Sequence, residues 1–316
     1  MKKQVKWKLP PIIFCFVTWY RFFWGMNKLT SGELSAAQTG YMVLALGLGS
    51  GQLLTVTHEI FHKKDVISRV LGTAAMVNTL FMQFFIEHIY CHHKHVGTPI
   101  DCSTAKFGQP FYSHFWQYFS GTFVFSWEYE AKRLGTAWSL NNRNFWFFAS
   151  ELAFTGLIYK LYGGYGVLIL LIQAVIGIYF MQLVNYVEHY GLERKEIAPG
   201  EYEPVTIKHS WNATHMISNY LFIKANRHSD HHKNPLNPYQ NLCTYMVSPT
   251  LPCGYGVCLL VANFPPIWFA IIDPLAKQAN EKGVVKAEDI VKSEKVLMTM
   301  VLVQSCLLTT LFFTLF

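Results

Sequence analysis

Charged residues are scarce in this chain of 316 residues. Asp, Glu, Lys and Arg make up 14% of the sequence, whereas they make up about 25% of a typical soluble domain. Hydrophobic residues reach 52% and aromatic residues 16%. The shortage of charge excludes an ordinary soluble globular domain, and the composition predicts an integral membrane protein.

Paired cysteine motifs are absent as well. None of the seven cysteines belongs to a CxxC motif, and Cys15, Cys258 and Cys306 lie within apolar runs. We interpret the cysteines as buried or lipid-facing thiols in a reducing compartment. A glycine-rich dinucleotide fingerprint is also missing, so any electrons for redox chemistry would come from a separate protein.

Six apolar runs divide the sequence. A membrane-spanning helix needs about 20 apolar residues, and the runs at 41–57, 166–184 and 296–316 fit that length well. The others occupy 9–25, 145–159 and 255–272. Because the last of these contains Pro265 and Pro266, it is expected either to cross the membrane or to lie at its interface.

Lysines at the N-terminus predict the orientation. Four of them precede the first run, at positions 2, 3, 6 and 8, which places the N-terminus in the cytoplasm by the positive-inside rule. Four spans through the first four runs leave every large polar segment on the cytoplasmic face of a plasma, inner or endoplasmic reticulum membrane. The apolar segment 70–85 must then lie in the membrane plane or fold back.

Histidines gather in four short motifs on this predicted face. The motifs are HEIFH, EHIYCHH, NYVEHYG and RHSDHH, and their histidines are His58, His62, His88, His92, His93, His189, His228, His231 and His232. The pairs 58/62, 88/92 and 228/232 are each four residues apart. Each pair is therefore predicted to project from one side of a helix.

The number of histidines indicates more than one metal ion. HEIFH alone would predict a zinc peptidase with Glu59 as general base, but a catalytic zinc takes only three protein ligands and a water. Neutral imidazole suits Zn, Cu, Fe and Ni, and nine nitrogens are enough for two metals. Glu59, Glu87, Glu188 and Asp230 each stand beside a histidine, so we expect them to accept the second N–H of a ligating ring.

These motifs carry a resemblance to a known family. The chain resembles the integral-membrane alkane 1-monooxygenases, within the wider membrane fatty-acid hydroxylase and desaturase superfamily. The stretches that carry the resemblance are HEIFHKK (58–64), EHIYCHHKHVGTPID (87–101), NYVEHYGL (185–192), SWNATH (210–215), NRHSDHH (226–232), LPCGYG (251–256) and PPIWFAIIDP (265–274).

The resemblance implies a di-iron centre that uses molecular oxygen to hydroxylate the terminal carbon of an alkane or alkyl chain taken from the membrane. The nine histidines would be its ligands, with His215 nearby, and no catalytic residue is expected beyond the metal centre. The implied electron carrier is a separate rubredoxin, or alternatively a ferredoxin or cytochrome b5. No nucleic-acid partner is expected.

The expected fold class is all-α, a polytopic membrane helical bundle with a histidine-rich di-iron site at its cytoplasmic face. Residues 1–275 are predicted to form the membrane hydroxylase domain. Residues 276–295 would be a polar linker, and 296–316 a C-terminal transmembrane helix that ends on the opposite side of the membrane from the N-terminus.

Three departures from the family pattern stand out. Cys91 occupies a position where glycine is usual, and Cys102 follows Asp101 where proline is usual. Two apolar runs precede HEIFH, where the family leads us to expect four, so part of the wall of the substrate channel is expected to differ.

Three other interpretations remain open from the sequence. The first is an acyl-lipid or sterol desaturase or hydroxylase with the same metals. The second is a zinc membrane peptidase built on HEIFH, in which the histidines of the other motifs would be dispensable. The third is a metal-binding membrane protein without catalytic activity.

Overall fold

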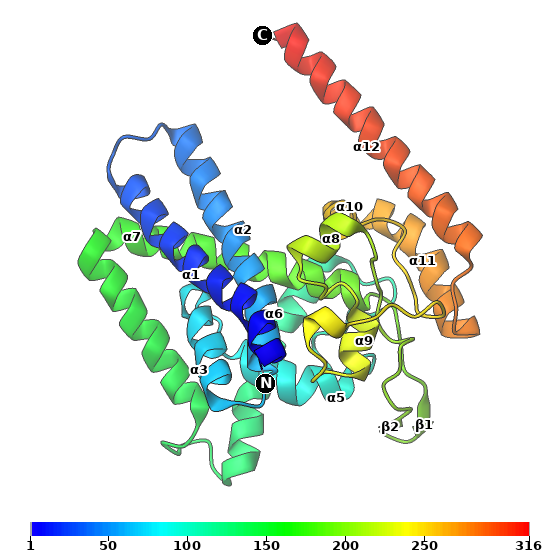
Figure 1. Cartoon of the computed structure of the whole chain (residues 1–316), viewed down its shortest axis with the longest axis horizontal. Helices are drawn as coiled ribbons and strands as arrows, with labels where there is room; N and C mark the ends of the chain where they lie inside the picture. The colour runs from blue at the N-terminus through cyan, green and yellow to red at the C-terminus, as the bar shows by residue number, and fades with distance from the viewer. Residues whose placement is uncertain (1, 316) are drawn as a thin grey trace.

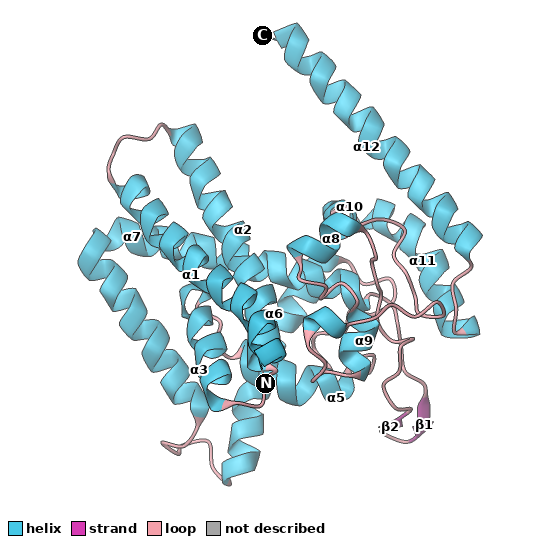
Figure 2. Ribbon diagram, in the orientation of Figure 1, coloured by secondary structure: helices cyan, strands magenta, loops and turns pink. Residues whose placement is uncertain are grey.

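The computed structural model describes the backbone of residues 2–315 and the side chains of residues 9–304. The described chain is mostly helical, with a single two-stranded antiparallel hairpin among its described residues (Figure 2). The elements are α1 (Lys2–Thr30), α2 (Ala36–Phe61), α3 (Val66–Ala75), the 3₁₀ turn η1 (Met76–Thr79), α4 (Phe84–Glu87), the π-helical turn η2 (His88–His92), α5 (His93–His95), α6 (Phe111–Leu134), α7 (Arg143–His189), β1 (Glu196–Ala198), β2 (Glu201–Tyr202), α8 (Met216–Leu221), α9 (His228–Lys233), the 3₁₀ turn η3 (Tyr239–Asn241), α10 (Tyr255–Ala262), α11 (Pro265–Lys282) and α12 (Ala287–Leu315).

Glycines let α2 and α7 pack with their backbones in contact. A Cβ atom at Gly47 would lie 2.5 Å from the Cβ of Ile176, and one at Gly51 would lie 2.7 Å from the carbonyl oxygen of Gly177. Only small residues permit so close a crossing. Since residue numbers increase together along both helices at this crossing, the two helices run in the same direction, and their C-terminal ends reach the same region of the molecule.

Helix α7 consists of two limbs rather than one straight rod. At Gly163 the backbone adopts φ 66° and ψ −167°, a conformation that is essentially restricted to glycine. Figure 1 shows α7 as two limbs that meet at a sharp bend. The apolar runs predicted at 145–159 and 166–184 fall on separate limbs, so the sequence was right to treat them as two segments.

The segment between the first two histidine motifs folds back. Helix α3 ends at Ala75, and Leu80 takes a left-handed conformation with φ 51° before α4 begins. Buried polar contacts hold this turn: Glu151 of α7 accepts a hydrogen bond from the Met82 N–H at 2.8 Å, and Gln173 donates to the Asn78 carbonyl at 2.5 Å. Of the two arrangements predicted for segment 70–85, the structure has the folded-back one.

The run 255–272 is broken into two helices. Helix α10 ends at Ala262 and α11 begins at Pro265, with both prolines in the first turn of α11. The two helices bury Tyr255, Trp268 and Ile272 in the core that surrounds the C-terminal end of α7. The run therefore does not form one continuous span, and it packs against the C-terminal end of α7.

Two helices of the described residues are long and apolar enough to cross a membrane, namely α2 and α7. The sequence predicted four spans up to this point; the runs at 145–159 and 166–184 are the two limbs of α7, and α1, which contains the first run, is not among these two helices. Helix α12 begins inside the predicted polar linker and extends away from the body (Figure 1). Most of the predicted tail span, 305–316, lies outside the residues whose side chains are described.

Candidate metal centre

All nine histidines of the four motifs meet at the C-terminal ends of α2 and α7. They form two groups, and within each group the nitrogen atoms available to a metal lie within 4.8 Å of one another. The first group contains His58, His62, His88, His93 and His231, and the second contains His92, His189, His228 and His232. Eight of the nine rings are buried, and His93 alone is half-buried.

The two groups are interleaved along the chain. The neighbours His92 and His93 belong to different groups, and so do His231 and His232. The consecutive turns η2 and α5 therefore contribute to both groups, and so does the short helix α9. A displacement of either helix would disturb both groups at once.

The π-helical turn changes which histidines share a side. The spacing predicts that His88 and His92 project together, but the structure places them in different groups and pairs His88 with His93 instead. The reason is that residues 88–92 form a π-helical turn, whose hydrogen bonds run from residue i to i+5. The pairs 58/62 and 228/232 lie in α-helical geometry and do share a group.

Ring nitrogens approach one another closely within each group. Neighbouring Nε2 atoms are 2.9–3.2 Å apart in the pairs His93–His88, His93–His62, His93–His231, His58–His62, His228–His189 and His228–His232. A neutral imidazole has one N–H, so a single proton cannot satisfy one nitrogen that faces three others. A cation at the centre of each group would satisfy all of them.

The spacing of the closest nitrogens can be compared with that of ligands around one metal ion. With a metal–nitrogen bond of about 2.1 Å, two ligands at 90° are about 3.0 Å apart, and two at the tetrahedral angle are about 3.4 Å apart. The observed 2.9–3.2 Å fits right angles. These separations are short enough for several nitrogens of one group to bind the same metal ion.

Burial keeps these nitrogens free to bind a metal. Burial, together with the charge of neighbouring histidines, lowers the pKa well below its usual value in five of the rings: His62, His88, His93, His231 and His232. Burial also lowers the pKa of His228 to about 3. Because only the neutral ring can act as a ligand, these side chains are ready for a metal at neutral pH.

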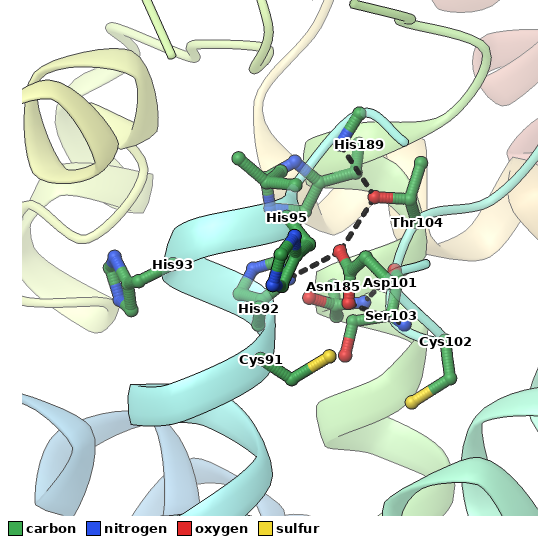
Figure 3. Close-up of polar contacts among 12 residues, drawn as sticks. Cys91, His92, His93, His95, Asp101, Cys102, Ser103, Thr104, Asn185 and His189 are labelled. Carbon is green, nitrogen blue, oxygen red and sulfur yellow. Dashed lines mark hydrogen bonds and ion pairs between the residues drawn. The ribbon is translucent and has the colours of Figure 1, made fainter. Parts of the chain in front are cut away.

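Asp101 is the carboxylate that holds a histidine of the centre. Its Oδ2 lies 2.8 Å from His92 Nδ1, and both side chains are fully buried (Figure 3). Thr104 donates to the same oxygen at 2.7 Å, and the Ser103 N–H donates to Oδ1 at 3.0 Å. Although burial opposes both shifts, the pairing raises the pKa of His92 and lowers that of Asp101. His92 thus keeps its Nδ1 protonated and turns Nε2 toward the second group.

Sequence reasoning missed this role of Asp101. It selected carboxylates that are neighbours of histidines in the chain, whereas Asp101 stands nine residues after His92. The sequence did contain a signal, because the longer stretch EHIYCHHKHVGTPID (87–101) ends at Asp101. What could not be read was the loop 96–104, which turns back and places the carboxylate beside the ring.

The four carboxylates that the sequence placed near the metals have different surroundings. Glu188 lies 3.4 Å from His228 Nδ1 and accepts the Tyr255 hydroxyl at 2.8 Å. Among the described residues, the other three form no hydrogen bond or ion pair with a histidine of the groups: Glu59 pairs with Lys63, Glu87 accepts from Ser103 at 2.7 Å, and Asp230 accepts from the Cys243 N–H at 2.8 Å.

Backbone and hydroxyl groups support other rings. The Ala225 carbonyl lies 3.1 Å from His228 Nδ1, and the Ser210 hydroxyl lies 3.5 Å from His189 Nδ1. His215 belongs to neither group and stands at the start of α8, where its carbonyl accepts from the Asn219 N–H. The motif SWNATH therefore reaches the centre through Ser210 and not through its histidine.

A small cavity of about 30 Å³ lies between the two groups. His58 and His88 of the first group and His228 of the second reach it. The remaining lining is mostly apolar and comes from α2, α4, α7 and the loop before α9: Leu54, Thr55, Phe84, Met181, Val184, Asn185, Glu188 and Ala225. A small apolar part of a molecule bound in this cavity would lie within reach of both groups of histidines.

Comparison with known proteins agrees with this geometry. Residues 35–252 match the family model for fatty acid desaturases. Alkane 1-monooxygenase 2 of Pseudomonas aeruginosa is 35% identical over 237 residues, and alkane 1-monooxygenase 2 of Alcanivorax borkumensis is 30% identical over 280 residues, which are 87% of this chain and 73% of that protein. The chain belongs to the alkane 1-monooxygenase family, within the fatty acid desaturase family. The matched segment contains all nine histidines and Asp101.

Some members of the alkane 1-monooxygenase family are matched over only part of their length. The aligned segment covers 73% of this chain but 63% of the P. aeruginosa protein. For the alkane 1-monooxygenase of Acinetobacter baylyi, which is 34% identical over 248 residues, the shares are 77% and 61%. The chain thus spans less than two thirds of these two relatives.

The two cysteines that depart from the alkane 1-monooxygenase pattern lie outside both histidine groups. Cys91 is buried and its thiol donates to the Ile100 carbonyl at 3.8 Å, while the Cys102 thiol donates to Glu87 at 3.7 Å. Burial raises the pKa of both thiols. They are therefore protonated at neutral pH, and neither belongs to a histidine group.

Replacing Asp101 with alanine is expected to weaken iron binding or lower activity about 10- to 100-fold, because His92 would lose the partner that fixes its tautomer. Iron affinity can be measured by competition with a chelator on the purified chain. Glu59→Gln is the matched control, since Glu59 adjoins His58 in sequence but pairs with Lys63. Equal iron affinity in the Asp101→Ala variant and the control would assign Asp101 a purely structural role.

Proposed function

We propose that this chain is a membrane di-iron monooxygenase that hydroxylates the terminal carbon of an alkane or alkyl chain. It would use molecular oxygen and electrons from a separate carrier protein. The observation that carries the proposal is the small apolar cavity reached by histidines of both groups. Its volume of about 30 Å³ is roughly two to three times the 10–15 Å³ that a cavity needs to hold one water molecule, so the end of a chain fits more readily than its middle.

The residues of the chain have distinct parts in this reaction. The nine histidines would hold two iron ions, and these ions, when bound, supply the activation of molecular oxygen and the cleavage of a C–H bond. Asp101 keeps the His92 ring in one tautomer. Leu54, Phe84 and Val184 exclude water from the cavity and orient the substrate carbon.

A second candidate follows from the family model, which is described for fatty acid desaturases. In that case the same centre would remove two hydrogens from an acyl chain. The zinc peptidase is less well supported, because Glu59 pairs with Lys63 and does not reach the cavity. It would also leave the second group of histidines without a function.

Product analysis with ¹⁸O₂ tests the proposal. The purified, iron-loaded chain would be supplied with a medium-length alkane and a chemical electron donor, and the products analysed by mass spectrometry. The expected product is a primary alcohol that carries one ¹⁸O atom. An unsaturated product without ¹⁸O from an acyl substrate would favour the desaturase, and an absence of any oxygen-dependent product would contradict both.

We further propose that residues 1–275 form the membrane enzyme domain, that 276–295 connect it to the tail, and that 296–316 cross the membrane. The histidine groups would face the cytoplasm. Compartment-specific tags at Lys64 and at Glu196 are then expected on the same side, with a tag at the C-terminus on the opposite side. Tags at Lys64 and Glu196 on opposite sides would exclude a shared centre.

A further inference from the structure

Two ligands of the first group line an open depression in the surface of the molecule. His93 is the only one of the nine histidines that is not buried, and with His62 it lines an open depression of about 140 Å³. The depression shares no lining residue with the cavity between the two groups. The first group of histidines is therefore approached from two separate sides.

Basic and apolar residues surround this depression. Arg69 lines it, and the guanidinium of Arg69 donates to the carbonyl of Lys63, so the rim continues into the pair Lys63 and Lys64 that follows His62. Pro235 and the exposed Leu236 form an apolar edge, two residues after Lys233. The carboxylates on these stretches are Glu59, which is buried and paired with Lys63, and Asp65, which caps α3.

A larger hollow of about 830 Å³ on the other side of the centre lacks these properties. It is lined by Lys106 and Arg194 but also by Asp101, Glu193 and Glu196, so its charges nearly balance. No histidine of either group lines it, and it reaches His92 only through Asp101. Both proximity to a ligand and charge distinguish the depression over His93.

We propose that the depression over His62 and His93, with its rim of Lys63, Lys64, Arg69, Pro235 and Leu236, is the docking site of the electron carrier. The carrier it fits is a small, acidic, one-electron protein. This inference rests on the proposed function. It follows because electron transfer slows steeply with distance, so electrons enter where a ligand ring is nearest to the surface.

The electron balance requires repeated docking. Hydroxylation of a substrate RH consumes one O₂, two electrons and two protons, and yields ROH and one H₂O. A one-electron carrier must therefore bind, be oxidised and leave twice in each turnover. Electrostatic attraction suits such transient contacts because it speeds association, and the net charge of +7 on the chain acts in the same direction.

Binding of an acidic rubredoxin, used as the probe, tests the location of the site. The double variant Lys64→Glu/Arg69→Glu of the full chain in neutral detergent is expected to raise the Kd for oxidised rubredoxin at least ~10-fold at low salt. The effect is expected to shrink at about 0.3 M salt, where screening is strong. Biolayer interferometry gives the Kd without any need for turnover, so the metal-free chain can be measured as well.

The matched control is Lys106→Glu/Lys195→Glu, which makes the same change of charge: Lys106 lines the larger hollow, and Lys195 stands in sequence between its lining residues Arg194 and Glu196. Its Kd is expected to stay within about twofold of that of the unaltered chain. Equal losses in both double variants would mean that only net charge matters, and a larger loss in the control would move docking to the other hollow. Either result would overturn the proposal, as would unchanged rubredoxin binding accompanied by weaker binding to phosphatidylglycerol vesicles.

A small electron donor separates this proposal from the proposed function. With dithionite and methyl viologen in place of rubredoxin, the Lys64→Glu/Arg69→Glu variant is expected to form product at the rate of the unaltered chain. A lower rate with this donor too would place the defect in the centre and would overturn the docking assignment. If neither the variants nor the unaltered chain form product with any donor, the proposed function fails. The binding measurements still decide the docking site in that case.

Discussion

Alanine at His231 and alanine at His189 are each expected to abolish turnover, although the two histidines belong to different groups. Each ring lies among close nitrogen neighbours, and both groups reach one cavity. Loss of one ligand would displace the metal that the others hold, and residues that act as a unit lose function together. We expect a loss of at least ~10³-fold for either variant, a magnitude seen when members of a catalytic unit are removed.

Iron content gives an independent measure of these variants. The unaltered chain is expected to bind two iron ions, one for each group, and each variant is expected to lose iron from its own group. His95→Ala is the matched control, because His95 adjoins the second motif but belongs to neither group. Substantial turnover by both ligand variants would remove their groups from the active centre, and one zinc with no iron would favour the peptidase.

Phenylalanine at Val184 is expected to lower kcat/KM at least ~100-fold while iron is retained. Val184 lines the cavity of about 30 Å³ between the groups, and the added ring carbons exceed that volume. A terminal carbon would then be held away from its reactive position, and small misplacements of this kind cost about 10²-fold. The opposite change, Val184→Ala, is expected to enlarge the cavity and to shift part of the product from the terminal to the adjacent carbon.

Val187→Phe is the control for the cost of overpacking. Val187 is fully buried one turn further along α7, and it does not line the cavity. Both phenylalanine variants are expected to lose about 1–3 kcal/mol of stability, but only Val184→Phe is expected to lose turnover. Product ratios from gas chromatography and melting temperatures of all three variants check this. Unchanged regiochemistry in Val184→Ala would place the reacting carbon elsewhere.

Much of the centre could be predicted from local sequence. The four histidine motifs are recognisable in a chain that is poor in polar residues, and the α-helical pairs 58/62 and 228/232 share a group as their spacing indicates. The two apolar segments on either side of Gly163 were also predicted, whereas the division of the run 255–272 into two helices was not. Each of the predicted features depends on residues within a few positions of one another, so local rules are sufficient.

The sequence by itself determined that this is an apolar, mostly helical chain with nine clustered histidines. Only the tertiary structure decided how those histidines divide. The π-helical turn at 88–92 moves His92 into the second group, and the folded loop brings Asp101 to it. The left-handed conformation of Leu80 and the close crossing of α2 and α7 at their glycines bring together motifs that are far apart in the sequence. Such long-range contacts depend on packing among separate helices, and the spacing of residues along the chain does not encode them.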